Sequence, residues 1–169
     1  VFSFPLKHRI ATSGFLFKEK EKLRHMKPEM INYYNIPFRE INGIKGGADF
    51  VTARGEVVPN EQLTTPPTPP RSYAYCSDTA YDESIVPHIK EVDVLYHEAT
   101  FQESEIDRAI KTGHSTARQA AEIAGLADVE KLVIGHFSSR YKELDTLLKE
   151  AQDVFPNTEL AFEGKVIEL

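Results

Sequence analysis

The feature that most constrains the fold is a repeated pairing, from residue 71 onward, of an apolar segment with a reactive polar side chain at its end. The pairs are residues 72–76 with Asp78, residues 92–96 with His97 and Glu98, and residues 131–135 with His136. Helical patterns occur at residues 83–90 and 142–155 and most clearly at 116–125, where a capping box and a final glycine bound the helix. Strands that alternate with helices predict a sheet covered by helices. The polar ends then meet at the edge where ligands bind.

The remaining parts of the chain have weaker patterns. Residues 1–17 predict two short strands around a break at Ser13–Gly14, and residues 159–162 and 166–167 have strand character. Prolines and glycines interrupt residues 18–70, which end in a proline-rich spacer, and only residues 48–52 and 56–58 predict a hairpin. An insertion of this length without regular structure is typical of a lid or an arm.

Composition excludes several classes of protein. Twenty Lys and Arg against 26 Asp and Glu give a net charge of −6, which excludes a non-specific polycation for nucleic acid or membranes. The single cysteine, Cys76, excludes intrachain disulfides, indicates a reducing, cytoplasmic compartment, and is expected to be a buried small hydrophobe. No apolar run approaches the roughly 20 residues of a membrane span. The chain has no nucleophile elbow, phosphate-binding glycine loop or CxxC pair.

The strand-end residues favour metal chemistry. His8 and His114 also stand in expected loops, so histidines and carboxylates could converge at one edge of the sheet. Imidazoles with a carboxylate suit zinc or a similar cation, and a bridging aspartate suits a dinuclear hydrolytic centre. Taken singly, Asp78 is more often a turn former and His114 more often a surface residue, whereas for His97 a structural role and a functional one are equally consistent with the sequence.

Four motifs in order change this balance. They are Ser77-Asp78-Thr79, His97-Glu98-Ala99-Thr100-Phe101, Gly113-His114-Ser115-Thr116 and His136-Phe137-Ser138-Ser139-Arg140-Tyr141. Together they resemble the ribonuclease Z (tRNase Z) family, and the resemblance runs from about residue 1 to residue 157. The resemblance implies the metallo-β-lactamase fold, an α+β four-layer (αββα) sandwich of two facing sheets with helices outside. The chain is similar to its second half, with residues 1–17 ending the first half, 18–70 an inserted flexible arm and 71–169 the second half.

The resemblance also implies a metal site and its chemistry. By position in the motifs, His8 would bind one of two zinc ions, Asp78 would bridge both, and His136 would bind the second. His114 would stabilise or protonate the leaving oxygen during phosphodiester cleavage. Glu98 would fix the tautomer of a histidine.

Substrate contacts are implied as well. Ser138 and Arg140, on the turn after His136, would hold a substrate phosphate, a role that suits a planar guanidinium. The family's arm is an exosite for tRNA, and residues 18–54 carry eight basic and five acidic residues, a net charge of +3. The expected exosite residues are Lys18, Lys20, Lys22, Arg24, Lys27, Arg39, Lys45 and Arg54.

One part of the family pattern is missing. The signature His-x-His-x-Asp-His loop, which supplies three further ligands and the aspartate that activates water, does not occur in this sequence. His8, Asp78 and His136 alone are too few to complete two coordination shells. We therefore expect either the carboxyl-terminal part of a longer protein, with about 130 residues upstream, or a fragment without catalytic competence.

The resulting expectation is a zinc-dependent endoribonuclease that removes the 3′ trailer from precursor tRNA, as a homodimer and without a membrane partner. Two alternatives stay open. One is another phosphodiesterase or hydrolase of the metallo-β-lactamase fold. The other is a non-catalytic RNA-binding or dimerisation fragment.

Overall fold

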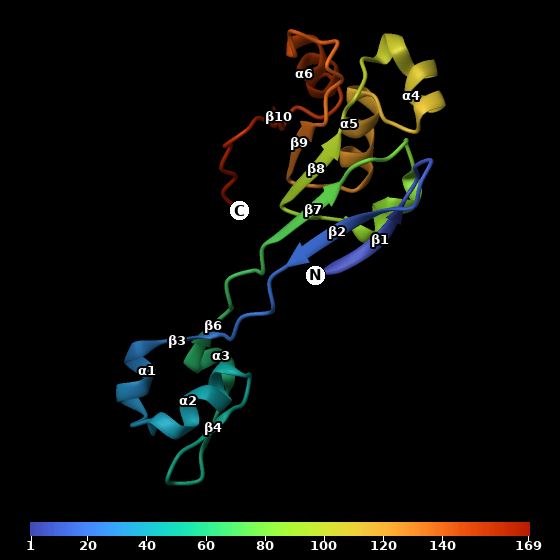
Figure 1. The fold of residues 1–169 in the computed structure, drawn as a ribbon. Helices are drawn as coiled ribbons and strands as arrows, with labels where there is room; N and C mark the ends of the chain where they lie inside the picture. The colour runs from blue at the N-terminus through green and yellow to red at the C-terminus, as the bar shows by residue number, and fades with distance from the viewer. The chain divides into compact units, whose positions relative to one another are not determined.

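The computed structural model describes residues 1–169, which form two compact units. The larger unit combines Val1–Lys18 with Arg71–Leu169, and the smaller unit is Glu19–Pro70. Figure 1 labels the helices and strands of both units. None of the helices is both long enough and apolar enough to cross a lipid bilayer.

The larger unit is built on one six-stranded sheet in the order β1-β2-β7-β8-β9-β10. Its strands are β1 (Phe2–Leu6), β2 (Thr12–Lys18), β7 (Ser72–Cys76), β8 (Val94–Glu98), β9 (Lys131–Gly135) and β10 (Thr158–Leu160). β1, β2 and β7 are joined by antiparallel pairing, whereas β7, β8, β9 and β10 run parallel. The carboxyl ends of β7, β8 and β9 therefore lie side by side at one edge (Figure 1).

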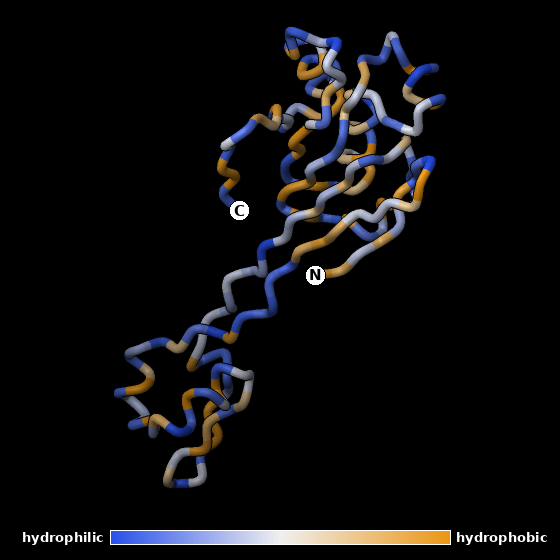
Figure 2. The backbone as a smooth tube through the Cα atoms, viewed as in Figure 1, coloured by the Kyte–Doolittle hydropathy of each residue, from blue (hydrophilic) through white to orange (hydrophobic).

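Helices and 3-10 turns connect the parallel strands. They are η1 (Glu83–His88), η2 (Glu103–Glu105), α4 (Ile106–Thr112), α5 (Ala117–Leu126) and α6 (Asp145–Gln152). α5 packs on β8, β9 and α6, and Figure 2 shows apolar residues concentrated in these strands. The buried face of α5 is Ala117, Ala120, Ala121, Ile123 and Ala124. Small side chains on this face let the helix approach the sheet closely, and their burial stabilises the unit.

The capping box of α5 is confirmed, but its predicted end is wrong. The side chain of Thr116 accepts a hydrogen bond from the backbone N–H of Gln119, whose side chain accepts one from the backbone N–H of Thr116. Gly125 lies inside the helix, which runs to Leu126 with Ala127 as its C-cap. Burial of Ala127 and its hydrogen bond to Ile123 continue the helix past the glycine.

The predicted break at Ser13–Gly14 is also wrong. The turn between the first two strands covers residues 7–11, and Gly14 lies inside β2, opposite Phe4 of β1. A Cβ atom on Gly14 would lie 2.5 Å from Cε2 of the Phe4 ring. Glycine is therefore present because the Phe4 ring packs against its backbone, not because the chain turns there.

The carboxyl-terminal elements are shorter than their patterns. α6 covers eight residues of the predicted 142–155, and β10 is the last strand. Residues 166–167 form no strand because the chain turns before them. Lys165 donates its N–H to the carbonyl of Phe162, with Gly164 at a φ of +80°.

The smaller unit corrects the expectation of an unstructured insertion. It contains α1 (Pro28–Tyr33), α2 (Phe38–Lys45) and α3 (Asn60–Leu63), and the antiparallel pairs β3 (His25–Met26) with β6 (Thr64–Thr65) and β4 (Phe50–Val51) with β5 (Val57–Val58). The β4–β5 hairpin was predicted and is confirmed. The unit has its own core of Ile36, Ile44, Phe50, Val58 and Leu63.

The side chain of Asn60 holds this small core together. Its Nδ2 donates to the carbonyls of Ile44 and Ala48, at 2.7 and 2.8 Å, and its Oδ1 accepts from the hydroxyl of Thr64 at 2.9 Å. The backbone N–H of Asn60 donates to the carboxylate of Asp49. One buried amide thus ties α2, α3 and the loop before β4 together, where proline and glycine spacing gave no regular pattern.

Candidate metal centre

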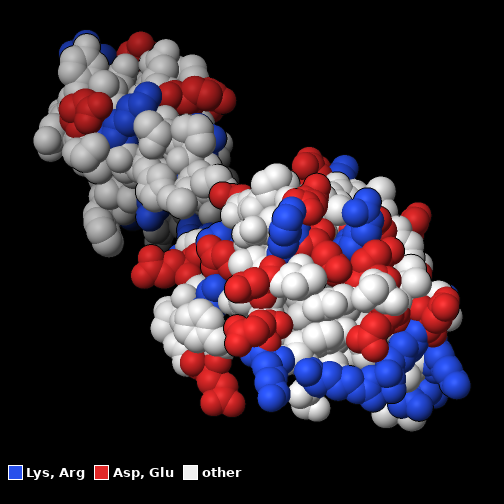
Figure 3. Space-filling model, turned by 90° about the horizontal axis from the view of Figure 1, so that it is seen from above, with Lys and Arg blue, Asp and Glu red and all other residues white.

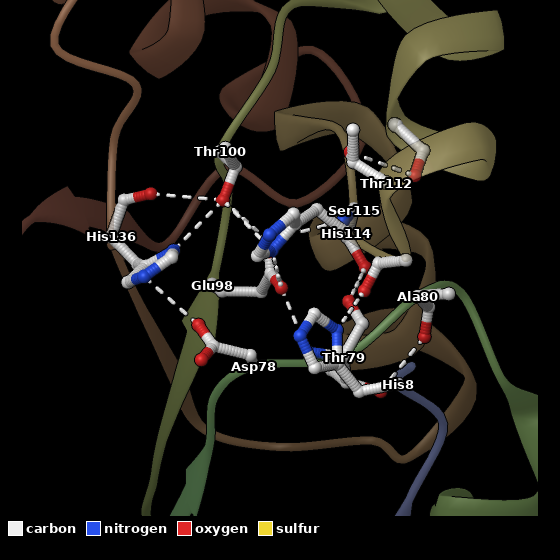
Figure 4. Close-up of polar contacts among 12 residues, drawn as sticks. His8, Asp78, Thr79, Ala80, Glu98, Thr100, Thr112, His114, Ser115 and His136 are labelled. Atoms are coloured by element: carbon white, nitrogen blue, oxygen red, sulfur yellow. Dashed lines mark hydrogen bonds and ion pairs between the residues drawn. The ribbon is translucent and has the colours of Figure 1, made fainter. Parts of the chain in front are cut away.

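Four side chains converge at the carboxyl edge of the parallel strands. Asp78 follows β7, Glu98 ends β8, His136 follows β9, and His114 lies between α4 and α5 (Figure 4). Each offers a ligand atom, and these atoms all lie within 4.8 Å of one another. The parallel register that pairs Cys76 with His97 and Glu98 with Gly135 brings the three strand-end residues, which are 20 to 58 positions apart in the sequence, to one place.

Glu98 is the centre of this arrangement. Its carboxylate is fully buried and has four hydrogen-bond partners, which are the backbone N–H groups of Thr79 and Ser115, the Thr100 hydroxyl and Nδ1 of His114, at 2.7–3.1 Å. An ionised carboxylate only accepts hydrogen bonds. Four converging donors therefore offset the cost of burying the charge.

The atoms of Asp78 and His136 face each other in a way that fits a cation. Oδ1 of Asp78 lies 2.8 Å from Nε2 of His136. Oδ1 is nevertheless buried with no hydrogen-bond partner, because the two atoms do not have the alignment of a hydrogen bond. Carboxylate oxygen and imidazole nitrogen are both ligands of divalent metals. A divalent metal ion therefore fits this edge.

The two histidines of the cluster are held by their neighbours. His136 adopts a φ of +58°, in the left-handed region, directly after β9. Its ring is stacked on that of His114, with centroids 5.3 Å apart. His114 follows Gly113, the left-handed C-cap of α4, and donates from Nδ1 to Glu98. Its Nε2 is thus the nitrogen left for chemistry.

His8 lies beside the cluster but is not part of it. Its ring is 5.0 Å from that of His114 between centroids, and its Nδ1 donates to the carbonyl of Gly113 at 2.7 Å. This bond leaves Nε2 of His8 as its free ligand atom. The four residues with mutually close ligand atoms do not include His8.

The turn after β9 carries the two expected phosphate contacts. Ser138 donates its N–H to the carbonyl of Thr100, and the exposed Arg140 lies 4.0 Å from the carboxylate of Glu105. The hydroxyl of Tyr141 donates to Glu105 and accepts from the N–H of Gln102, which anchors the turn. The hydrogen bond from the Tyr141 hydroxyl lowers the pKa of Glu105, so this carboxylate stays ionised beside Arg140.

Sequence reasoning missed Thr79, Thr100 and Ser115 as partners of Glu98. All three stood inside the quoted motifs, and that position was the available signal. The prediction that Cys76 is a buried small hydrophobe is confirmed, and burial raises the pKa of its thiol to about 12. His97 is also fully buried, and burial lowers its pKa, so its ring is a neutral structural group.

The expected exosite residues are spread over both units, and many have partners. Lys18 belongs to β2 of the larger unit. Arg24 donates to Thr64, Lys27 donates to the carbonyls of α3, and Lys22 and Arg39 pair with neighbouring glutamates. Lys20, Lys45 and Arg54 complete the set.

The smaller unit as a whole is not basic. Glu19–Pro70 holds seven Lys and Arg and seven Asp and Glu, so the net charge of +3 for residues 18–54 does not extend to the folded unit. Figure 3 shows that both acidic and basic side chains are present on the face in view. The difference has two causes: Glu56 and Glu61 belong to the same fold but follow residue 54, and Lys18 belongs to the larger unit.

An open cleft of about 770 Å³ lies within the smaller unit. It lies between the end of α1, the start of α2 and the β4–β5 hairpin. Its lining includes two aromatic rings, two arginines and three acidic residues: Tyr33, Tyr34, Arg39, Arg54, Glu40, Asp49 and Glu56. The ring of Tyr33 is largely exposed and meets Tyr34 edge to face. Exposed aromatic rings and guanidinium groups are the surfaces on which nucleic-acid bases stack.

Comparison with known proteins gives a consistent answer. No family model matches the chain. The curated relative from Parabacteroides distasonis, named Ribonuclease Z, is 57% identical over 164 residues, which cover 97% of this chain and 54% of the relative. Its namesake in Bacteroides thetaiotaomicron is 53% identical over 167 residues, 99% of this chain and 53% of the relative. The chain thus spans about half the length of these relatives.

Solved structures agree on the fold. The metallo-β-lactamase fold protein YhfI from Bacillus subtilis matches with a TM-score of 0.62 at 18% identity, over 98% of this chain and 48% of that protein. Human tRNase Z, short form, matches with a TM-score of 0.54 at 24% identity, over 98% of this chain and 41% of that protein. The expected fold class is confirmed. By sequence and fold, the chain belongs to the ribonuclease Z family of metallo-β-lactamase fold proteins.

Proposed function

We propose that the chain is the carboxyl-terminal half of a zinc-dependent endoribonuclease that removes the 3′ trailer from precursor tRNA. The observation that carries the proposal is the convergence of Asp78, Glu98, His114 and His136 at one strand edge. The names of the relatives support the same activity. The proposal extends to the whole protein, of which this chain is about half.

Asp78 and His136 of the cluster, together with the neighbouring His8, would hold the metal. Asp78 Oδ1 and His136 Nε2 already face each other at 2.8 Å, and His8 can contribute Nε2 because its Nδ1 is engaged by Gly113. A bound zinc pair would supply an activated water near neutral pH and would neutralise charge on the phosphate. The remaining ligands would come from the loop that this sequence lacks.

His114 would act on the leaving group. Its Nδ1 proton is held by the buried Glu98 carboxylate, so the ring is oriented and Nε2 is free to hold a proton for the ribose 3′ oxygen. Arg140 and Ser138, on the anchored turn after β9, would contact the scissile phosphate.

The smaller unit would bind RNA away from the cluster. Its equal numbers of acidic and basic residues mean that local contacts, not net charge, must supply the affinity. The cleft with Tyr33, Arg39 and Arg54 offers stacking surfaces and guanidinium groups for a nucleic-acid backbone. A homodimer in the cytoplasm, where precursor tRNA is processed, completes the proposal.

Cleavage assays test this proposal against another hydrolase of the same fold. The full-length polypeptide containing these residues is given a precursor tRNA with a 3′ trailer and, separately, bis-p-nitrophenyl phosphate. We expect kcat/KM to favour the precursor tRNA, with cleavage at the trailer junction. Preference for the small diester would contradict the tRNA assignment and favour the general phosphodiesterase.

The non-catalytic alternative is tested by metal analysis. Two zinc ions per full-length chain, both lost in the Asp78→Ala variant, would exclude a purely RNA-binding or dimerisation module. Zinc-free protein after purification and zinc dialysis would favour that module. Sedimentation equilibrium on the same samples measures the proposed dimer.

A further inference from the structure

The hydroxyl of Thr100 occupies an unusual position between the two halves of the cluster. Thr100 follows β8 and is buried, and its Oγ1 lies 2.7 Å from Oε2 of Glu98, 2.9 Å from Nδ1 of His136 and 2.9 Å from the carbonyl oxygen of His136. A hydroxyl has one proton to donate and two lone pairs to accept with. Three close partners therefore restrict where each proton can be.

Proton accounting decides the state of the His136 ring. The carboxylate of Glu98 and the carbonyl of His136 can only accept, so the hydroxyl proton of Thr100 is needed at one of them. The shorter contact, to the ionised Glu98, is the stronger acceptor. If the hydroxyl donated to Nδ1 of His136 instead, Oγ1 would face two acceptor oxygens at 2.7 and 2.9 Å with no proton between them. With Nδ1 of His136 protonated and donating to Thr100, and the hydroxyl donating to Glu98, only the contact to the His136 carbonyl is left without a proton, so this is the better satisfied arrangement.

The opposite side of the ring agrees with this assignment. A neutral imidazole that is protonated at Nδ1 has a lone pair at Nε2. Nε2 of His136 lies 2.8 Å from Oδ1 of Asp78, and no hydrogen bond joins them. A proton on Nε2 would have a carboxylate oxygen in reach and would be expected to align with it. The unaligned contact matches a lone pair.

We infer that Thr100 is a positioning residue that holds His136 in the Nδ1–H tautomer. Glu98 thereby sets both histidines of the cluster, His114 by a direct hydrogen bond from Nδ1 to Oε1 and His136 through the Thr100 hydroxyl on Oε2. Both rings then present Nε2 on the side away from Glu98. The tautomer stands on the hydrogen bonds alone, whereas its value for metal binding rests on the proposed function.

Backbone contacts strengthen the link between Thr100 and the turn that carries His136. The carbonyl of Thr100 accepts the N–H of Ser138, and the N–H of the preceding Ala99 donates to Gly135. His136 itself is held at a positive φ between these two bonds. These two hydrogen bonds therefore join the loop after β8 to the loop after β9 on both sides of His136.

Long-range ¹H–¹⁵N NMR of the histidine rings, on the metal-free chain at about pH 8 where ordinary imidazoles are neutral, measures the tautomer. The His136 signals are identified by their loss in His136→Gln, since the chain has six histidines. We expect the Nδ1–H pattern in the parent chain and in Thr100→Ser, which keeps the hydroxyl. We expect Thr100→Val to shift His136 toward the Nε2–H pattern.

The matched control is Thr158→Val, which removes another buried threonine hydroxyl, in β10, and should leave His136 unchanged. An Nε2–H pattern in the parent chain would overturn the inference even if Thr100→Val fails to fold. Retention of a pure Nδ1–H pattern in a folded Thr100→Val chain would overturn the role of Thr100.

Zinc affinity separates this inference from the proposed function. In the full-length polypeptide, Thr100→Val should weaken zinc binding about 10–100-fold, the usual loss when the partner of a ligand is removed, and Thr100→Ser should restore it. If the tautomer responds as expected while the full-length parent binds no zinc, the positioning role stands and the metal-dependent function fails. If zinc binds but the tautomer is Nε2–H, the reverse holds.

Discussion

Each compact unit of the chain is organised around one buried polar side chain, Glu98 in the larger unit and Asn60 in the smaller one. The partners of Glu98 include two side chains at the carboxyl edge of the parallel strands, His114 and Thr100. The partners of Asn60 are mostly backbone groups that join short elements. A buried, hydrogen-bonded polar side chain therefore has a different role in each unit. Glu98 arranges chemistry on a sheet with a large apolar core, whereas Asn60 supplements a core of five residues.

The largest predicted effect follows from removal of the proposed general acid, His114, which belongs to the larger unit. His114→Ala in the full-length polypeptide should lower kcat for precursor tRNA by about 10²–10⁴-fold, the usual contribution of a general acid. Zinc content and RNA affinity should stay nearly unchanged, because Asp78, His136 and the smaller unit are intact. Single-turnover kinetics with zinc analysis measures this. Loss of zinc in the variant would instead identify His114 as a ligand.

Removal of the smaller unit tests the other side of the comparison. Lys18 of β2 is paired with Ser72 of β7 in an antiparallel register, so an Asn-Gly hairpin can replace residues 19–71. We expect RNA affinity to fall about 10–100-fold, the loss of one or two stacked bases. Hydrolysis of a small diester should persist. A joint fall of both activities would indicate that the smaller unit is structural.

The contrast between the units also explains what the sequence could predict. The cluster at the carboxyl edge of the parallel strands could be predicted because β7, β8 and β9 are each followed by or end in a polar residue, and parallel pairing brings those ends together. The role of Thr100 could not be predicted because it depends on how closely the loop after β8 approaches the loop after β9, which a sequence pattern does not specify.

The smaller unit was not predictable in the same way. Its helices are four to eight residues long, too short for a periodic pattern to be recognised, and they are stabilised by tertiary contacts to Asn60. The glycines were interpreted as breaks at Ser13–Gly14 and throughout residues 18–70, yet Gly14 and Gly43 both lie inside regular elements. What a glycine means depends on the atoms packed against it, and these are remote in sequence.

Asn60→Ala should unfold the smaller unit selectively. The substitution removes the Nδ2 donor from the carbonyl of Ala48 and one of the two donors to the buried carbonyl of Ile44, which keeps the N–H of Gly47, at a cost of roughly 1–3 kcal/mol. Amide hydrogen exchange should increase within Glu19–Pro70 and stay unchanged in β7, β8 and β9. The exposed Asn32→Ala in α1 is the matched control. Equal loss of protection in both units would show that they are not separate.

Substitution of Gly14 and of Gly43 should give the smallest changes in the free energy of unfolding, and the two changes should have opposite signs. Gly14→Ala should destabilise the larger unit by roughly 1–2 kcal/mol, because its Cβ would collide with the Phe4 ring. Gly43→Ala should stabilise the smaller unit by roughly 0.5–1 kcal/mol, because no atom lies near the new Cβ and alanine favours the helix. Urea denaturation measures both. Effects of the same sign would contradict the packing described for one of them.

The central claim is that the carboxyl edge of β7, β8 and β9 is a metal centre. Isothermal titration of the metal-free, full-length polypeptide with zinc tests it most directly, comparing the parent with Asp78→Ala and with the exposed Asp107→Ala as control. The account predicts saturable binding that Asp78→Ala abolishes and Asp107→Ala preserves. Zinc binding that survives Asp78→Ala unchanged, or a full-length parent that binds none, would contradict it.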